Sequence, residues 1–430
     1  MRILVGTVDT AGQIPDIADG FRQVGYQVTT AVSDRNPFYP HHQYDVEVYR
    51  RTIQWSWKVN HLIQLGRLPL LIAPHDIFVF LWGGTSLVVN NSEYPLLKAL
   101  GKRIVSMFCG DDIRHQSSFD QQSAFLVKNK SCVPLKVLRQ QGPEIFKNDP
   151  LARPLRNLRI AERWSDLIIS QPNQSGLAVR PYMHFFVPLN LSHYKKVVPG
   201  RDVPVVVHAP SNKSVKGTDM ILAALERLKL EGVPCEVRLL HGVSSNEVFP
   251  ELAGADVVVD QLHVPLHGKL GVEAMASGCA LATCNREECE PFPPARPIWH
   301  IGPENLYIQL KRLLIDKDLR IRLARKGREY VEQYHDHVNV ARRIVEHLSV
   351  EKLKRYDHYP TFFACDYRLP EDVEIPAYLK RMTAQVVQRW GLPESVDPQD
   401  MIARGLMSAD GLNVSKPIPR WKSAPSAVTI

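Results

Sequence analysis

Short apolar runs rich in β-branched residues alternate with helix-like segments from the first residue of this chain. "RILVGTV" leads through Gly12 into an apolar-periodic segment that ends at Gly25, and "YQVTTAV" follows. The same order continues through "DIFVFL", "RIVSMFC" and "DLIIS", with a long polar stretch over roughly 117–165 that we expect to be helical. This alternation is typical of βαβ units with a parallel sheet. We therefore predict that residues 1–190 form one doubly wound, Rossmann-like domain.

The pattern starts again after residue 190. "DVPVVVHA", "CEVRLLHG", "ADVVVDQL" and "CALATC" are the predicted strands, and "GTDMILAALERLKLEG" is a predicted helix with Thr218 as its N-cap. We predict a second α/β domain over residues 191–350 and, over 351–430, a partly helical extension with a loose tail. Since open α/β sheets bind ligands at the carboxyl ends of their strands, two in series predict a cleft between them.

The net charge indicates which binding partners are compatible with the chain, and the cysteine content indicates its cellular compartment. The 430 residues carry a net charge of +8, which suits a partner with phosphates. No basic run is interleaved with stacking aromatics, so we do not expect nucleic acid. Contact with an anionic membrane surface is a hypothesis from charge alone. The start "MRILVGTVDT" reads as a strand, and seven cysteines without a CxxC pair indicate reduced thiols and no metal site. These features predict a soluble, cytoplasmic protein.

The loop "HAPSNKSVKGTD" joins a strand of the second domain to a helix. Lys213 and Lys216 stand beside Gly217 and near Asn212 in this loop. Two ammonium groups next to a helix N-terminus suit a diphosphate. The plainer alternative, a solvated turn, is equally compatible with this piece alone.

The stretch "HGKLGVEAMASGCALAT" is a glycine-rich bend that runs into a helix beginning near Leu270. Gly268 and Gly271 let backbone lie against a ligand, and the helix start offers N–H groups to an anion. Glu273, one turn into the helix, is suited to accept hydrogen bonds from a ribose diol. The alternative is a packed helix with one exposed glutamate.

Two loops of the first domain are predicted to face the same cleft. "FCGDDIRH" follows a strand and presents Asp112 and Arg114, which we predict to be catalytic together with Lys213 and Lys216. We interpret the Asp111–Asp112 pair as a turn that orients Arg114. "LWGGTS", with Gly83, Gly84 and Thr85, follows the neighbouring strand and is expected to line the acceptor side together with Gly12.

These motifs resemble those of a known family. "VVVHAPSNKSVKGTD" and "DQLHVPLHGKLGVEAMASGCALAT" are similar to the donor domain of GT-B fold glycosyltransferases of the group 1, or family 4, type. "PLLKALGKRIVSMFCGDDIR" resembles the family's acceptor-domain segment that ends in an "HGSD.R" pattern. The resemblance implies that Lys213 and Lys216 bind a donor diphosphate, that Glu273 holds the ribose, and that the backbone of Lys269, Leu270, Gly271 and Val272 contacts the phosphate or the sugar.

Two positions depart from the family's pattern. Pro265 stands where many members have the first Glu of an E-x7-E motif, and Cys109 replaces the family's His. Relatives with a "DQL" arrangement also lack that Glu, so loss of activity does not follow.

The predicted function is transfer of a sugar from a nucleotide sugar to a glycan, lipid-linked or small-molecule acceptor. The resemblance implies retention of configuration, and the lysines would stabilise the leaving diphosphate without a metal or other cofactor. Two alternatives stay open, a nucleotide-sugar epimerase and a non-catalytic sugar-binding or scaffold protein of the same fold.

Overall fold

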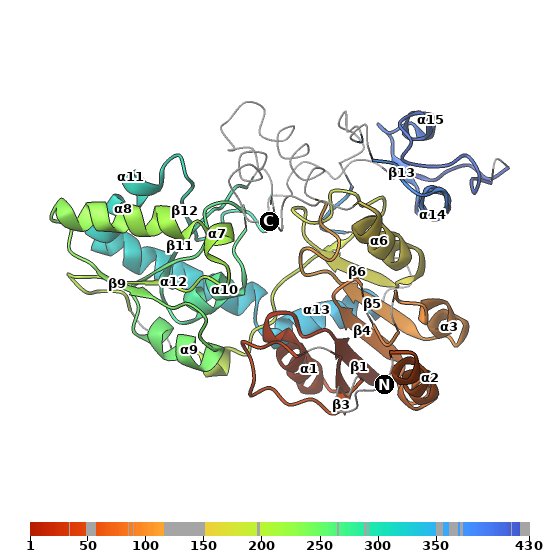
Figure 1. Ribbon diagram of the computed structural model, residues 1–430, viewed down its shortest axis with the longest axis horizontal. Helices are drawn as coiled ribbons and strands as arrows, with labels where there is room; N and C mark the ends of the chain where they lie inside the picture. The colour runs from red at the N-terminus through yellow and green to blue at the C-terminus, as the bar shows by residue number, and fades with distance from the viewer. Residues whose placement is uncertain are drawn as a thin grey trace.

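The computed structural model forms two lobes, each built around a parallel sheet (Figure 1). The structure describes residues 1–33, 35–48, 57–84, 86–88, 90–115, 151–195, 198–264, 266–287, 290, 292–349, 356–360, 369, 373–413 and 415–421. Most of the helical stretch predicted over 117–165 lies outside these residues. None of the helices in the described ranges is both long and apolar enough to cross a bilayer.

The first lobe holds a seven-stranded parallel sheet in the order β3-β2-β1-β4-β5-β6-β7. All five residues of β4 are buried, as expected for a central strand that helices cover on both faces. The strands are β1 (Arg2–Thr7), β2 (Gln27–Val32), β3 (Val46–Glu47), β4 (Ile77–Leu81), β5 (Arg103–Met107), β6 (Leu167–Ser170) and β7 (Met183–His184). The helices are α1 (Gln13–Gln23), α2 (Trp57–Ile72), α3 (Tyr94–Ala99) and α6 (Ala152–Trp164).

The second lobe holds a five-stranded parallel sheet in the order β12-β11-β10-β8-β9. Its strands are β8 (Val205–His208), β9 (Glu236–Leu239), β10 (Val257–Val259), β11 (Ala280–Thr283) and β12 (Trp299–His300). Its helices are α7 (Lys213–Lys216), α8 (Thr218–Leu230), α9 (Ser245–Ala253), α10 (Lys269–Ala276), α11 (Leu306–Ile315) and α12 (Lys317–Tyr334). The order of elements predicted from the sequence is confirmed in both lobes.

The predicted N-cap of α8 was wrong. Gly217, with φ +75°, is the N-cap of α8 and also the C-cap of α7. A left-handed backbone favours glycine there. The Thr218 hydroxyl is 2.8 Å from His208 Nε2 and so ties α8 to β8.

The strand orders fix where a ligand can bind. In the first sheet β2 lies on one side of β1 and β4 on the other, so the strand order reverses between β1 and β4. In the second sheet the order reverses in the same way between β8 and β10. Ligands of open parallel sheets bind outside the carboxyl ends of the strands at such switch points. The loop after β1 contacts α10, which follows β10, through a 3.2 Å hydrogen bond from Lys269 Nζ to the Gly12 carbonyl. The two switch points therefore face each other.

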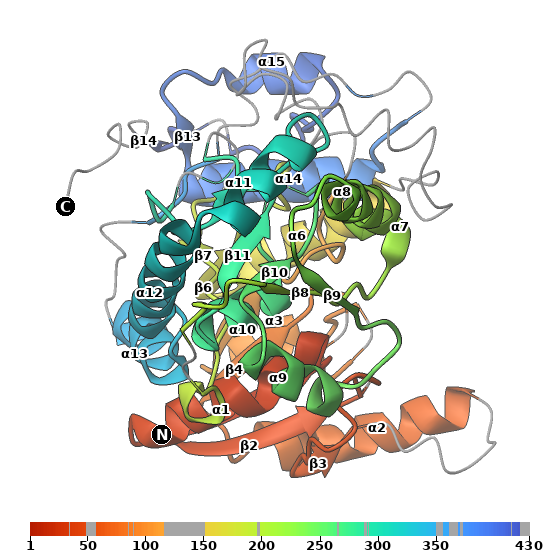
Figure 2. The ribbon, with the colours of Figure 1, turned by 90° about the vertical axis from the view of Figure 1, so that its left-hand side faces the viewer.

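The chain passes between the lobes twice, and the two passages are hydrogen-bonded together. The Leu189 N–H donates to the His335 carbonyl at 2.9 Å, and the His337 N–H donates to the Leu189 carbonyl at 3.1 Å. Beyond this point α13 (His337–Ser349) returns to the first lobe and packs against α1. Figure 2 shows α12 and α13 in succession along this return.

The C-terminal extension lies on the first lobe. α14 (Ala377–Trp390) packs against α6, and Leu379 and Val387 of α14 share a buried apolar cluster with Leu155 of α6. α15 (Pro398–Ala403) and the short strands β13 (Leu392–Pro393) and β14 (Arg420–Trp421) complete it.

We expect Gly20→Ala to destabilise the protein. A Cβ at Gly20 would lie 2.2 Å from the His337 carbonyl oxygen and 3.1 Å from the Ala341 Cβ, so α1 and α13 would have to separate. Overpacking of this kind costs about 1–3 kcal/mol. Urea denaturation measures the loss.

Gly66→Ala is the matched control, because Gly66 lies in α2 with nothing within 4 Å of its Cβ position. We expect this change to stabilise the protein by about 0.5–1 kcal/mol. Equal stability of Gly20→Ala and the wild type would contradict the described α1–α13 contact.

Candidate functional site

Lys216 lies at the switch point of the second lobe. Its Nζ is 2.7 Å from Asp260 Oδ1 and 2.9 Å from Gln261 Oε1. The other oxygen of Asp260 accepts a 3.3 Å hydrogen bond from the backbone N–H of Gly268, the residue before α10. Asp260 therefore fixes both the lysine and the start of the helix. An anion at the α10 N-terminus would meet an ammonium group and the positive end of the helix dipole.

The neighbouring residues of the "KG" loop play different parts. Lys213 is exposed, and its side chain forms no hydrogen bond or ion pair with any residue that the structure describes. Asn212 caps α7, since its Oδ1 accepts from the Val215 N–H at 3.1 Å. A Cβ at Gly217 would lie 2.9 Å from a methyl group of Leu262, so this glycine lets α8 approach the loop after β10. Of the two predicted lysines, the structure brings only Lys216 to α10.

Glu273 is buried between the lobes with 4% of its surface exposed, so the alternative of a packed helix with one exposed glutamate is wrong. The hydroxyls of Tyr39 and Tyr194 donate to its Oε1 at 3.3 and 3.2 Å. Burial raises the pKa of the Glu273 carboxyl from 4.5 to about 7, while Lys269 and the two hydroxyls limit the rise. The carboxylate thus receives two hydroxyl groups from other parts of the chain.

Lys269 connects the lobes directly. Its Nζ bonds to the Gly12 carbonyl, lies 3.5 Å from Asp16 Oδ2, and sits 4.6 Å from the centre of the Tyr39 ring. Gly12 has φ +68°, and a Cβ there would lie 2.5 Å from the Tyr39 ring. Glycine at position 12 therefore gives Tyr39 the space to reach Glu273. Leu270, Gly271 and Val272 continue α10 behind this contact, and Gly271 and Val272 are buried.

Asp112 connects the loops that follow β4 and β5 in the first lobe. Its carboxylate accepts hydrogen bonds from the backbone N–H groups of Gly83 at 2.9 Å and Gly110 at 2.8 Å. A third, at 3.3 Å, comes from Cys109. Arg114 pairs at 2.6 Å with Asp111, so the first aspartate of the doublet orients the arginine. Gly84 follows in the same loop, whereas Thr85 and Pro265 lie outside the described residues.

Several residues at the lobe interface were missed by reasoning from the sequence. Tyr39 belongs to "FYPHHQY", a run whose aromatic content was the available signal. Asn173 lies in the loop after β6, and Glu290 and Arg296 lie in the loop after β11. All three are almost fully buried. The rule that ligands meet the carboxyl ends of parallel strands would have selected these loops, too.

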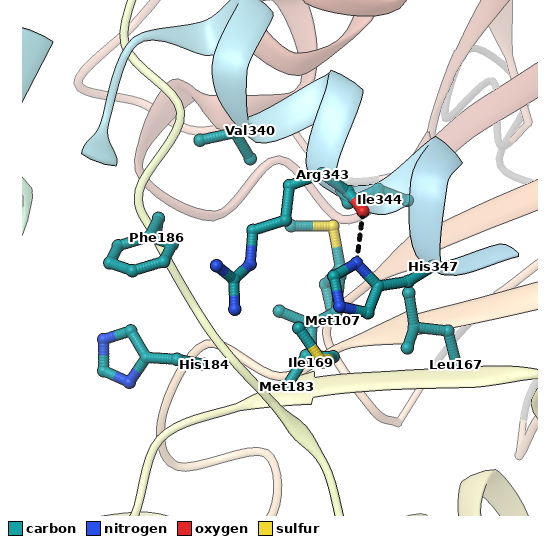
Figure 3. Close-up of a pocket in the computed structure, with 10 residues that line it drawn as sticks. All are labelled: Met107, Leu167, Ile169, Met183, His184, Phe186, Val340, Arg343, Ile344 and His347. Atoms are coloured by element: carbon teal, nitrogen blue, oxygen red, sulfur yellow. Dashed lines mark hydrogen bonds between the residues drawn. The ribbon is translucent and has the colours of Figure 1, made fainter. Parts of the chain in front are cut away.

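A small hollow near the passage between the lobes is shown in Figure 3. β5, β6, β7 and α13 enclose it, with Arg343 at its wall, and His347 Nδ1 lies 2.6 Å from the Arg343 carbonyl. Its volume of about 10 Å³ is no more than the ~10–15 Å³ that one water needs. This hollow is too small for a substrate.

Comparison with solved structures identifies the fold of this chain. No known family model matches the sequence, and no curated protein matches it as a relative. Sucrose-phosphate synthase from Thermosynechococcus elongatus is 14% identical over 80% of this chain and 97% of its own, with a TM-score of 0.51. An α-glucosyltransferase, in complex with UDP-glucose and DNA containing an abasic site, is 12% identical over 81% of this chain and 99% of its own, with a TM-score of 0.52. The predicted GT-B fold is confirmed.

We expect Glu273→Gln to change how stability depends on pH. A carboxyl whose pKa is raised from 4.5 to about 7 on folding contributes stability that is fully present below pH 4.5 and is lost as the pH rises through 7. The loss is on the order of 3 kcal/mol. Glutamine stays neutral and still accepts from both tyrosines, so the variant should match the wild type at pH 4.5 and exceed it at pH 8 in chemical denaturation.

Glu329→Gln, on the exposed face of α12, makes the same charge change outside the site and should leave the pH profile as it is in the wild type. Parallel profiles for the wild type and Glu273→Gln would show that the Glu273 carboxyl titrates normally.

Proposed function

We propose that this protein is a glycosyltransferase that uses a nucleoside-diphosphate sugar as its donor. The observation that carries the proposal is the position of Lys216, held by Asp260 at the N-terminus of α10 and at the switch point of a GT-B second lobe. The two solved structures described above support it, since one is a sucrose-phosphate synthase and the other an α-glucosyltransferase in complex with UDP-glucose.

The chemical task of such a site is to stabilise the leaving diphosphate. When the bond between the anomeric carbon of the sugar and the diphosphate breaks, negative charge grows on the diphosphate oxygen that leaves. Lys216 is oriented before any ligand arrives, because Asp260 and Gln261 both accept from its ammonium group. Preorganised charge of this kind needs no rearrangement during the reaction. We propose that this role requires no metal or other cofactor. We also propose that the exposed ammonium group of Lys213 adds a second positive charge near the diphosphate, and that the reaction retains the anomeric configuration.

Glu273 is the proposed ligand of the ribose. The hydroxyls of Tyr39 and Tyr194 stand in for a diol, because both donate to the same carboxylate oxygen. A ribose would make equivalent bonds once the Tyr39 side chain moves away from Gly12. Tyr39 sits on a loop that also reaches the second lobe through a 2.9 Å bond from the Ser245 N–H to the Phe38 carbonyl.

The acceptor side is proposed to be the loops after β1, β4 and β5, which carry Gly12, Gly83, Gly84 and Arg114. Closure of the lobes around both substrates would exclude water that would otherwise hydrolyse the donor. The acceptor is a hydroxyl-bearing glycan, lipid-linked sugar or small molecule. We propose peripheral membrane contact only from the basic charge, and absence of sedimentation with anionic liposomes would refute it.

A donor-binding protein without transferase activity is the second candidate. One observation favours it, namely that the Asp112 carboxylate is occupied by backbone N–H groups and is not presented to a substrate. Donor binding without turnover in the presence of acceptors would support this candidate, and turnover of the donor without an acceptor would indicate an epimerase or hydrolase.

We expect Lys216→Gln to weaken binding of a nucleoside diphosphate by about 10- to 100-fold, since a hydrogen bond to a charged group contributes about 1.5–3 kcal/mol. Titration calorimetry with UDP, ADP and GDP, and with the corresponding UDP-, ADP- and GDP-sugars, measures the loss. The amide can still donate to Asp260, which limits the disturbance of the buried carboxylate.

Lys229→Met is the control, because Lys229 is exposed at the far end of α8. It should bind the same nucleotide as tightly as the wild type. The proposal fails if no nucleotide binds to the wild type, or if Lys216→Gln binds as well as Lys229→Met while its melting temperature is unchanged.

A further inference from the structure

Three side chains at the lobe interface carry polar atoms that have no hydrogen-bond partner among the residues that the structure describes. Asn173 comes from the loop after β6 in the first lobe, and Glu290 and Arg296 come from the loop after β11 in the second. Their exposed fractions are 1%, 0% and 6%, respectively. Neither the diphosphate site at Lys216 nor the ribose site at Glu273 uses them. Together with Tyr330 and His267 they form what we call the interlobe polar cluster.

Each of the three residues is fixed through at least one polar group and has another with no partner among the described residues. The backbone N–H of Asn173 donates to Glu290 Oε1 at 2.6 Å, whereas the nitrogen and the oxygen of its side-chain amide have no partner within the described part of the chain. Glu290 Oε2 has none either. Arg296 donates from Nε to Asn285 Oδ1 at 2.9 Å and from Nη1 to the Glu290 carbonyl, and its Nη2 has no partner in the described ranges. The groups are therefore held in place before a ligand arrives.

Tyr330 and His267 extend the cluster toward α10. The Tyr330 hydroxyl and His267 Nδ1 are buried, and no described residue is a hydrogen-bond partner of either atom. Their rings are 6.1 Å apart, and both contact the His335 ring, at 5.3 and 5.6 Å. His267 directly precedes Gly268, so the cluster adjoins the N-terminus of α10, where Lys216 lies.

The chemistry of the cluster indicates the class of ligand. A buried polar group without a partner costs about 1–3 kcal/mol, and native proteins keep few of them. The Asn173 amide can donate and accept, and Arg296 can only donate. Burial raises the pKa of Glu290 to about 8, although the Asn173 N–H and the charges of Arg296 and Arg114 oppose the rise. Near neutral pH its carboxyl can thus donate as well as accept. Neighbouring hydroxyl groups, which also donate and accept, satisfy such a set better than an anion or a cation does.

We propose that the interlobe polar cluster is a hydroxyl-binding subsite for a monosaccharide ring. The assignment rests on the proposed glycosyltransferase function. The ring would contact Asn173 from one lobe and Glu290 and Arg296 from the other, so its binding favours the closed arrangement of the lobes. Two sources share this chemistry, the sugar of the donor and a sugar of the acceptor.

Asn173→Ala tests the subsite, because it removes the unpartnered amide and keeps the N–H that binds Glu290. We expect the melting temperature of the free protein to stay the same or rise, since a buried group without a partner is lost. Affinity for a nucleoside-diphosphate sugar should fall by about tenfold or more, while affinity for the nucleoside diphosphate alone stays the same. The probes are the pairs UDP and UDP-glucose, ADP and ADP-glucose, and GDP and GDP-mannose.

A second readout does not depend on the nucleotide. Saturation-transfer NMR with glucose, galactose, mannose and N-acetylglucosamine, with and without the bound nucleoside diphosphate, reports a free sugar in the subsite. If Asn173→Ala loses this signal but keeps full affinity for the nucleotide sugar, the subsite holds the acceptor. Asn246→Ala, on the exposed face of α9, is the control and should match the wild type in every measurement.

The outcomes separate the two proposals. If no nucleotide binds to the wild type but a monosaccharide binds to it and not to Asn173→Ala, the subsite stands and the glycosyltransferase proposal fails. The subsite is refuted if Asn173→Ala binds nucleotide sugars and monosaccharides as tightly as the wild type does. It is also refuted if the wild type binds no monosaccharide and binds each nucleotide sugar no more tightly than the matching nucleoside diphosphate. In either case the cluster holds water only.

Discussion

The paired passages of the chain between the lobes are the constraint on which the site depends. Leu189 exchanges two backbone hydrogen bonds with the turn from α12 to α13, at His335 and His337. The outgoing and returning segments are therefore fixed to each other. Because both segments cross at one place, the carboxyl edges of the two sheets are brought opposite each other, and the loop that follows β1 meets α10, which follows β10.

Charges at this meeting place are largely arranged in pairs. Lys216 faces Asp260, Lys269 faces Asp16, and Arg114 faces Asp111. Isolated charges in a closing interface would lose their hydration without compensation. Because each of these cations is paired with a carboxylate, the lobes can approach each other in the free protein and the cationic side chains keep their orientation. Glu273 and Glu290 are exceptions, since burial disfavours the ionised form of each carboxyl more than the neighbouring cations stabilise it.

Reasoning from the sequence predicted the local elements well and the contacts between the lobes poorly. The strands, the glycine turn before α10 and the lysine at its N-terminus follow from patterns within a few residues. The environment of Glu273 does not, because Tyr39 and Tyr194 lie 234 and 79 residues away from it in the chain. Asp112 shows the same limit. Its position after β5 was predictable, but its backbone partner Gly83 belongs to a different loop, so a carboxylate expected to face the cleft instead joins two loops.

The contact between α1 and α13 has a consequence for biosynthesis. Ile14, Ile17 and Phe21 of α1 share a buried cluster with Val340, Ala341 and Ile344 of α13. A ribosome makes α1 first and α13 only after the whole second lobe. The part of α1 that contacts α13 therefore stays uncovered while about three hundred further residues are synthesised, a span set by the positions of α1 and α13 in the chain. The first lobe emerges first but is completed last, and until then its exposed helix is a surface that chaperones can recognise.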